Sequence, residues 1–287
     1  MDRELVRRLI AAQFPRWADL PVRTLPVDGW DNRSFRLGDT MLVRLPSAAA
    51  YAGQVGTEQC WLPRLAPHLP LAIPEPLACG RPGEGYPFSW SIYRWIEGET
   101  AAAARVGELQ ALAAALARFL GALQEIDPAG GPKPGARNFH RGGALAAYDA
   151  EAREAIRRLS PSIDAVAATS LWDAAVRTTW RRDPVWVHGD VSAGNLLVRD
   201  GELAAVIDFG QLAVGDPACD LAIAWTFLDQ RSRAVFRSTL ELDADTWLRG
   251  RAWGLWKAAT VAAGLAATNA VERTNAARTL EAVLAGD

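Results

Sequence analysis

The chain has 287 residues and half of them are hydrophobic, which suffices for two lobes with a sizeable core and excludes wholesale disorder. The formal net charge of −2 gives no sign of a nucleic-acid-binding surface. The N-terminal stretch mixes acids with bases, and no run approaches about 18 uncharged apolar residues, so we expect neither a signal peptide nor a membrane span. A cytoplasmic location is the default expectation.

The cysteines and basic residues refine this picture. Cys60, Cys79 and Cys219 lie far apart in apolar contexts without CxxC spacing, so we expect buried free thiols in a reducing compartment. Arginine supplies all but two of the 31 basic residues, a bias that we interpret as genome composition. An arginine can therefore stand where another protein would carry a lysine.

The first third of the chain predicts a helix followed by strands. Residues 1–14 are amphipathic. Three short apolar–polar runs separated by Asp-Gly and Gly-Asp signals indicate antiparallel hairpins; they are 24–29, 30–39 and 40–46. A helical pattern at 56–69, which Pro63 and Pro67 should shorten or kink, and a strand at 88–99 follow.

From residue 100 onwards the pattern becomes helical. Apolar residues three and four apart at 108–126 are followed by a Gly/Pro-rich loop at 128–141 and, later, by one hairpin-like insert at 185–210. The predicted helices are 108–126, 146–159, 170–182, one that begins at 217, and 246–268. Strands before helices predict an α+β fold with two lobes, residues 1–97 and 98–287.

The insert carries the chemistry-bearing residues. His188-Gly189-Asp190 is followed five residues later by Asn195, and then by Asp208 in an Asp-Phe-Gly turn. Phosphoryl transfer needs a carboxylate that orients a hydroxyl and accepts its proton, and oxygen ligands for the metal ions on the phosphates. Asp190 can supply the first, while Asn195 and Asp208 can bind Mg²⁺. Each residue alone would be ordinary, but the ordered combination points to a kinase.

These motifs, VHGDVSAGNLLV followed by IDFGQLAVGDPACDLA, resemble the aminoglycoside phosphotransferase family within the protein-kinase-like superfamily. The resemblance covers nearly the whole chain and implies a bilobal protein-kinase-like fold, with a small antiparallel-sheet N-lobe and a larger, mostly helical C-lobe. It implies ATP, or GTP, and Mg²⁺ in the cleft between them. Asp190 resembles the catalytic Asp, and Asn195 and Asp208 resemble the metal ligands. His188 and Asp220 resemble residues that support the catalytic loop, and Asp216 one that stabilises the following turn or helix start.

The N-terminal lobe resembles the family less sharply. Arg44 stands where a kinase carries its phosphate-contacting Lys, and Glu58 is its expected ion-pair partner or else a plain surface acid. There is no GxGxxG motif. Gly29 is the candidate for a phosphate-covering turn, with Asn32 and Ser34 as phosphate contacts, although a simple hairpin is the alternative. The strand around Tyr93 resembles the hinge, so the resemblance places Tyr93 at the back of the pocket and the backbones of Arg94 and Ile96 on adenine.

The acceptor is less defined by the sequence. Trp225, Trp253 and Trp256 are candidate pocket walls, and a cationic antibiotic would need acids near Asp190. The candidate acids in helical segments are Asp149, Glu151, Glu154, Asp229, Glu241, Asp243 and Asp245. We expect a small hydroxylated substrate, an aminoglycoside or another antibiotic, with a sugar or amino alcohol as the alternative. No nucleic-acid or membrane partner is expected, and the protein is predicted to be a monomer or homodimer.

Two other functions compete with a small-molecule kinase. A protein kinase needs a long peptide-binding segment, but about a dozen residues separate Asp208 from Asp220, and no Ala-Pro-Glu motif follows. A catalytically silent nucleotide-binding module would not need Asp190, Asn195 and Asp208 together. Both therefore rank below a small-molecule phosphotransferase.

Overall fold

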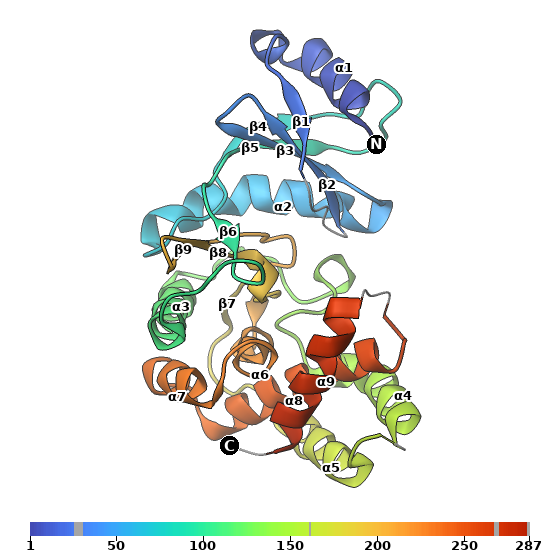
Figure 1. The fold of residues 1–287 in the computed structure, drawn as a ribbon, viewed down its shortest axis with the longest axis vertical. Helices are drawn as coiled ribbons and strands as arrows, with labels where there is room; N and C mark the ends of the chain where they lie inside the picture. Colours follow the sequence, from blue (N-terminus) through green and yellow to red (C-terminus); the bar gives the residue numbers. More distant parts are fainter. Residues whose placement is uncertain (26–30, 161, 267–269, 286–287) are drawn as a thin grey trace.

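The computed structural model describes residues 1–25, 31–160, 162–266 and 270–285, with 270–272 described by their backbone alone. A sheet flanked by two helices forms the N-terminal part, and a larger group of helices lies on the other side of the 185–210 insert (Figure 1). The α+β architecture predicted from the sequence is confirmed. Within the described residues, no helix is both long enough and apolar enough to span a bilayer.

The N-terminal sheet is antiparallel and has the strand order β1-β2-β3-β5-β4. Its strands are β1 (Val22–Thr24), β2 (Asn32–Leu37), β3 (Met41–Pro46), β4 (Pro76–Gly80) and β5 (Trp90–Arg94). The hairpin predicted at 30–46 is therefore present as β2 and β3, with Ser34 opposite Arg44. Most of the strand predicted at 24–29, and Gly29 with it, lies outside the described residues.

Two helices cover this sheet (Figure 1). The first, α1 (Arg3–Gln13), begins where the Asp2 carboxylate accepts a hydrogen bond from the Leu5 amide at 2.9 Å, and it buries Val6, Leu9 and Ile10. The second, α2 (Ala49–Leu65), starts seven residues earlier than predicted and tolerates Pro63 near its C-terminal end. Its inward face carries a buried acid, Glu58, towards the centre of the molecule.

The C-terminal part combines seven helices of the described chain with two small antiparallel sheets, β6-β8-β9 and β7-β10. The helices are α3 (Leu109–Glu125), α4 (Asp149–Leu159), α5 (Ala165–Val176), α6 (Ile223–Thr226), α7 (Gln230–Thr239), α8 (Ala244–Ala262) and α9 (Ala270–Leu284). The helix predicted at 170–182 is displaced: α5 begins earlier because Asp164 caps it through the Ala167 amide, and it ends at Val176.

One hairpin in this part brings the residues at its two ends together. Strand β7 (Val185–Val187) leads into the 188–195 loop, and β8 (Leu196–Arg199) pairs with β9 (Glu202–Val206). The turn uses Asp200 and Gly201 with φ of 56° and 84°, the left-handed pair that a tight hairpin needs. Because Leu196 lies opposite Val206, the residues before β8 and after β9 become neighbours. The remaining strands are β6 (Glu99–Thr100) and β10 (Ala213–Gly215).

The cysteine prediction was partly wrong. Cys219 is buried, but Cys60 and Cys79 are exposed, although all three are free thiols. Cys79 lies on β4 at the edge of the sheet, where alternate side chains face solvent. An apolar neighbourhood in sequence therefore does not bury an edge-strand side chain.

Candidate active site

The turn before Asp190 is held by a buried carboxylate. The two oxygens of Asp220 accept hydrogen bonds from the backbone amides of His188 and Gly189, each at 2.8 Å. Gly189 has a φ of 86°, and a Cβ there would lie 2.3 Å from the carbonyl oxygen of Gln211, so only glycine fits. Burial raises the pKa of Asp220, and the two amides oppose that shift by stabilising the anion. Asp220 thus holds the start of the 188–195 loop in place through its backbone.

The His188 ring connects this loop to the segment after β9. Its Nδ1 accepts from the Asp190 amide at 3.2 Å, so Nε2 carries the proton and donates to the Ile207 carbonyl at 3.0 Å. The ring is fully buried and packs edge-on against Phe209, with centroids 4.5 Å apart. Both ring nitrogens are thus engaged with the protein, which fits a buttress and leaves no nitrogen for a ligand.

Asp190 is held from two directions. The Asn195 side-chain amide donates to the Asp190 carbonyl at 2.9 Å and lies 3.4 Å from Oδ2, while Lys257 Nζ lies 2.9 Å from Oδ1. Burial alone would raise the pKa of Asp190, but the Lys257 ammonium, with Arg141 adding to it, outweighs burial and lowers that pKa. The carboxylate is therefore ionised and oriented. Lys257 was not predicted; its signal in the sequence is that it is one of two lysines among 31 basic residues.

Asn195 and Asp208 are brought together by the β8–β9 hairpin. The Ile207 amide donates to the Asn195 carbonyl at 2.9 Å, which places Asp208 next to Asn195. Asp208 has a φ of 66°, a backbone state that Asp tolerates better than most residues and that recurs at functional sites. Within the described chain, Asn195 Oδ1 accepts no hydrogen bond, because the amide nitrogen is the group turned towards Asp190.

Asn195 and Asp208 suit Mg²⁺ better than a metal that needs a full set of protein ligands. One amide oxygen and one carboxylate are hard ligands, and Mg²⁺ commonly binds through one or two such groups while phosphate and water complete its shell. The described residues contain no cluster of three or more His, Cys, Asp or Glu that could bind a metal alone. The site therefore suits a metal that arrives with a nucleotide.

Arg44 joins the N-terminal sheet to this site. Its guanidinium lies 3.3 Å from Glu58 Oε1 and 2.9 Å from Asp208 Oδ1. Burial would lower the pKa of Arg44, but Asp208 and Glu58 outweigh burial and hold that pKa above its ordinary value. Glu58 is buried and also accepts from the Tyr93 hydroxyl and the Phe209 amide. Glu58 is thus not a plain surface acid.

A cavity of about 1060 Å³ lies between the two parts of the chain. The residues around it include Asn32, Ser34, Arg44, Tyr93, Arg94, Ile96, Asn195, Asp208 and Lys257. The Arg94 amide already donates to the Glu75 carbonyl at 2.9 Å, so Arg94 cannot offer its N–H to a base. The backbone N–H and C=O of Ile96 have no hydrogen-bond partner among the described residues. The Ile96 amide, unlike that of Arg94, can therefore donate a hydrogen bond to a base.

Asp31, a further acid of this cavity, was not predicted. Its carboxylate accepts from the Gln54 side-chain amide at 3.3 Å. Burial raises the pKa of Asp31, and the nearby charges of Asp208 and Asp190 raise it further. Asp31 therefore lies close enough to Asp208 and Asp190 for their charges to interact.

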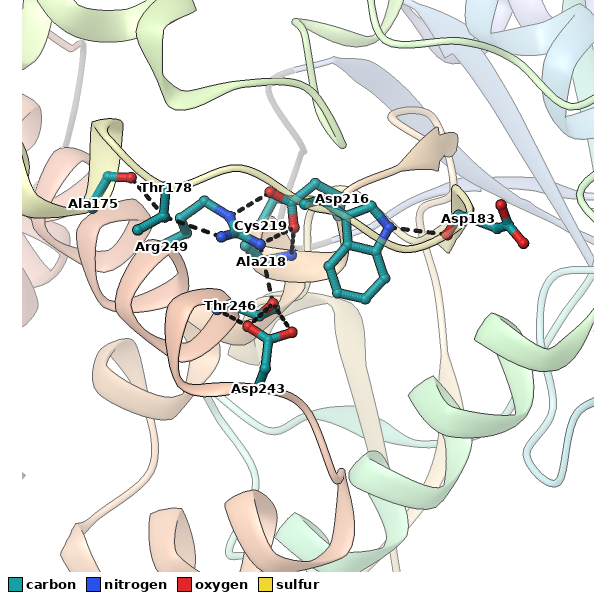
Figure 2. Close-up of polar contacts among 10 residues, drawn as sticks. Ala175, Thr178, Asp183, Asp216, Ala218, Cys219, Asp243, Thr246 and Arg249 are labelled. Carbon is teal, nitrogen blue, oxygen red and sulfur yellow. Dashed lines mark hydrogen bonds and ion pairs between the residues drawn. The ribbon is translucent and has the colours of Figure 1, made fainter.

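A second polar network is centred on Asp216 and Arg249 (Figure 2). Asp216 caps the short helix at 217–222 through the Ala218 amide at 3.0 Å, as expected, and also binds the Arg249 guanidinium at 2.6 and 3.2 Å. Arg249 is 2% exposed and donates to Thr178 and Thr246 as well, each at 3.0 Å. Its donors are used within the protein, so this network is structural.

The acceptor-side candidates do not converge on the cavity. Trp225 and Trp253 are buried in the core, and Trp256 donates to Glu151 at 2.9 Å outside the residues that line the cavity. None of the seven candidate acids lines it either. Asp229 and Asp243 instead cap helices α7 and α8. The tryptophans and acids chosen from the sequence are therefore not walls of this cavity.

A sequence profile of the phosphotransferase enzyme family matches residues 22–253, more than half of the chain. The chain belongs to this family. The family predicted from the motifs is thereby confirmed. An aminoglycoside 3'-phosphotransferase from Escherichia coli is 38% identical over 64 residues, which are 22% of this chain and 24% of that relative. The match thus spans about a quarter of the curated relative.

Solved structures extend the likeness over the whole phosphotransferase fold. The GDP and kanamycin complex of APH(2")-IIia superposes with a TM-score of 0.74 at 21% identity, covering 98% of both chains. The macrolide 2'-phosphotransferase MphH from Brachybacterium faecium gives a TM-score of 0.62 at 21% identity, covering 96% of this chain and 98% of its own. At this identity the likeness establishes the fold, and it confirms the predicted bilobal, kinase-like architecture.

Proposed function

We propose that this protein transfers the terminal phosphoryl group of ATP or GTP to a hydroxyl of a small molecule. The observation that carries this proposal is the convergence of Asn195, Asp208 and Arg44 at one cavity, with the ionised Asp190 carboxylate held directly behind it by Asn195 and Lys257, two residues that line the cavity. Phosphoryl transfer needs positioning and charge stabilisation more than covalent chemistry, and these groups supply both.

Each residue then has a distinct role. Asp190 accepts the proton of the acceptor hydroxyl as its oxygen bonds to the terminal phosphorus and the bond to the nucleoside diphosphate breaks. Asn195 and Asp208 would hold Mg²⁺, which neutralises charge on the phosphates. Arg44, fixed by Glu58, faces the phosphates, with Ser34 and Asn32 on the strand beside it. Residues 1–97 would then be the lobe that covers the nucleotide and 98–287 the lobe that binds the acceptor.

The base of the nucleotide would lie against the strand that ends near Ile96. Tyr93, Arg94 and Ile96 line the cavity, and the Ile96 backbone, which has no partner in the described part of the chain, can bond a ligand. Structures with GDP and with ADP are both known among the similar folds, so both ATP and GTP are to be tested as donors. Relatives that act on aminoglycosides and macrolides make a hydroxylated antibiotic the first acceptor class to try. Such a kinase would work in the cytoplasm, where its nucleotide is available.

The test is nucleotide turnover by the purified chain with Mg²⁺ and a panel of aminoglycosides, macrolides, sugars and amino alcohols, with products identified by mass. We expect one acceptor class to gain a phosphate. Asp190→Ala should lower kcat by about 10²- to 10⁴-fold and leave nucleotide affinity intact, because general-base assistance is of that size. Normal turnover by this variant would remove Asp190 from its role, and nucleotide binding without any turnover would favour a silent binding module.

A further inference from the structure

The Lys257–Asp190 pair adjoins the cavity, which Lys257 lines, and neither side chain is fully buried. Nζ and Oδ1 are 2.9 Å apart, and the side chains are 21% and 31% exposed. Lys257 lines the cavity together with Asn195 and Asp208, although it comes from α8 and they come from the hairpin. A buried structural ion pair such as Asp216–Arg249 does not face a ligand in this way.

Lys257 is the cation that contacts Asp190 directly within the described part of the chain. Arg141 also lies near, but its guanidinium is engaged by Gln211 at 2.8 Å and by the Tyr148 hydroxyl at 3.3 Å. Lys257 binds Oδ1 and Asn195 lies 3.4 Å from Oδ2, so each oxygen of the carboxylate has a contact that restrains it. An acceptor hydroxyl would meet a base with one orientation.

The ammonium group retains donors after it has bound Asp190. An ammonium carries three N–H groups, and Lys257 has no other hydrogen-bond partner among the described residues. It is also a compact point charge in a chain where 29 of 31 basic residues are arginine, whose wide planar fork would occupy more of the cavity. Its remaining N–H groups can face the acceptor or the transferred phosphoryl oxygens.

We propose that Lys257 is a positioning and specificity-determining residue: its ammonium holds the Asp190 carboxylate in one orientation and excludes acceptor ammonium groups from the space beside the reacting hydroxyl. The inference rests on the proposed kinase function and deepens it. The described residues that line the cavity from α8 and α9 are otherwise uncharged: Ala258, Val261, Asn275, Ala276 and Thr279. The acids that line the cavity, Asp31 and Asp208, interact with each other and with Arg44. The side of the cavity lined by α8 and α9 therefore suits an acceptor that is neutral or anionic near its reacting hydroxyl.

The experiment compares four full-length proteins, the wild type and the variants Lys257→Met, Lys257→Arg and Lys133→Met. Met keeps the length of the side chain without the charge, and Arg keeps the charge. Lys133, the other lysine, lies in an exposed loop outside the cavity and serves as the control. The probes are acceptor pairs that differ at the ammonium, glucosamine against glucose and kanamycin against its N-acetylated form, with ATP hydrolysis by water as the acceptor-free reading.

Lys257→Met should lower kcat by about 10- to 100-fold with KM for ATP unchanged, because an electrostatic and orienting contact is lost at the reacting centre. Lys257→Arg should recover part of that loss, and Lys133→Met should match the wild type. In Lys257→Met the preference for the neutral member of each pair should shrink. Thermal unfolding of all four proteins controls for folding.

An unchanged kcat in Lys257→Met, or a loss confined to KM for ATP, would overturn the inference while wild-type turnover kept the kinase function standing. Equal losses in the Met and Arg variants would show that shape and not charge matters, and would overturn it too. A wild type that turns over no nucleotide would instead defeat the proposed function itself, and the role of Lys257 with it.

Discussion

Replacing Glu58 by Gln tests whether this buried acid organises the nucleotide side of the site. The substitution keeps the size of the side chain and removes its charge. Glu58 accepts from Arg44 at 3.3 Å, from the Phe209 amide at 3.1 Å and from the Tyr93 hydroxyl. A glutamine can still accept from two of these donors, but its own NH₂ group must then face the third.

The expected cost follows from the contacts. Breaking a buried ion pair typically costs about 3–5 kcal/mol. Two features of this site reduce that figure: Arg44 keeps Asp208 at 2.9 Å, and burial raises the pKa of Glu58, so its anion is already costly to hold. We therefore expect a loss of about 2 kcal/mol in the free energy of unfolding, which would lower Tm by about 4 °C in a chain of this size. Arg44 would then pair with Asp208 alone, so KM for Mg·ATP should rise.

The assay is thermal unfolding followed by circular dichroism, with Glu75→Gln as the matched control. Glu75 pairs with Arg94 on the surface of the same lobe, where both side chains are 56% exposed, and such a pair contributes about 0–1 kcal/mol. Tyr93→Phe, alone and combined with Glu58→Gln, measures how strongly the two residues depend on each other. If Glu58→Gln has the same Tm as the Glu75→Gln control and an unchanged KM for ATP, Glu58 does not organise the nucleotide side of the site.

Two further substitutions test the metal site and its support. Asp208→Ala should weaken Mg²⁺-dependent nucleotide binding, and isothermal calorimetry showing the same Mg·ATP affinity would exclude Asp208 as a ligand. Arg249→Met should lower the free energy of unfolding by about 3–5 kcal/mol, because Asp216 would remain buried without its partner. Urea unfolding measures this, with Arg153→Met on the exposed Asp149 pair as a control that should cost under about 1 kcal/mol.

The hairpin part of the site could be predicted because its geometry is local. The Asp200-Gly201 turn sets the register of β8 and β9, and that register brings Asn195 beside Asp208 across only 13 residues of chain. Asp190 precedes the same hairpin by a short loop. Turn chemistry and strand alternation were therefore enough to place three side chains at one site.

Lys257 could not be found in the same way because its partner is 67 residues away. Helix α8 is buried on almost every side, from Thr246 to Thr260, so its sequence has no polar stripe to show which face meets the site. The acids and tryptophans of neighbouring helices failed for the related reason that helical spacing does not say which helix packs against which. Arg249 was not predicted to be buried either, because an arginine is rarely buried unless it pairs with an acid, and Asp216 is distant in the sequence.

Helix α8 then connects the two networks. A Cβ on Gly250 would lie 2.5 Å from Cβ of Leu221, so the helix packs against the 217–222 segment more closely than any side chain at 250 would allow. Arg249, the residue before Gly250, binds Asp216 at the start of that segment. Lys257 lies eight residues after Arg249, about 12 Å along the helix, and contacts Asp190. The same helix thus fixes the segment that carries Asp220, which supports the loop, and places a charge on the base that the loop presents. A shift of α8 at Gly250 would displace both contacts together, so the acceptor side of the site depends on packing that lies outside the cavity.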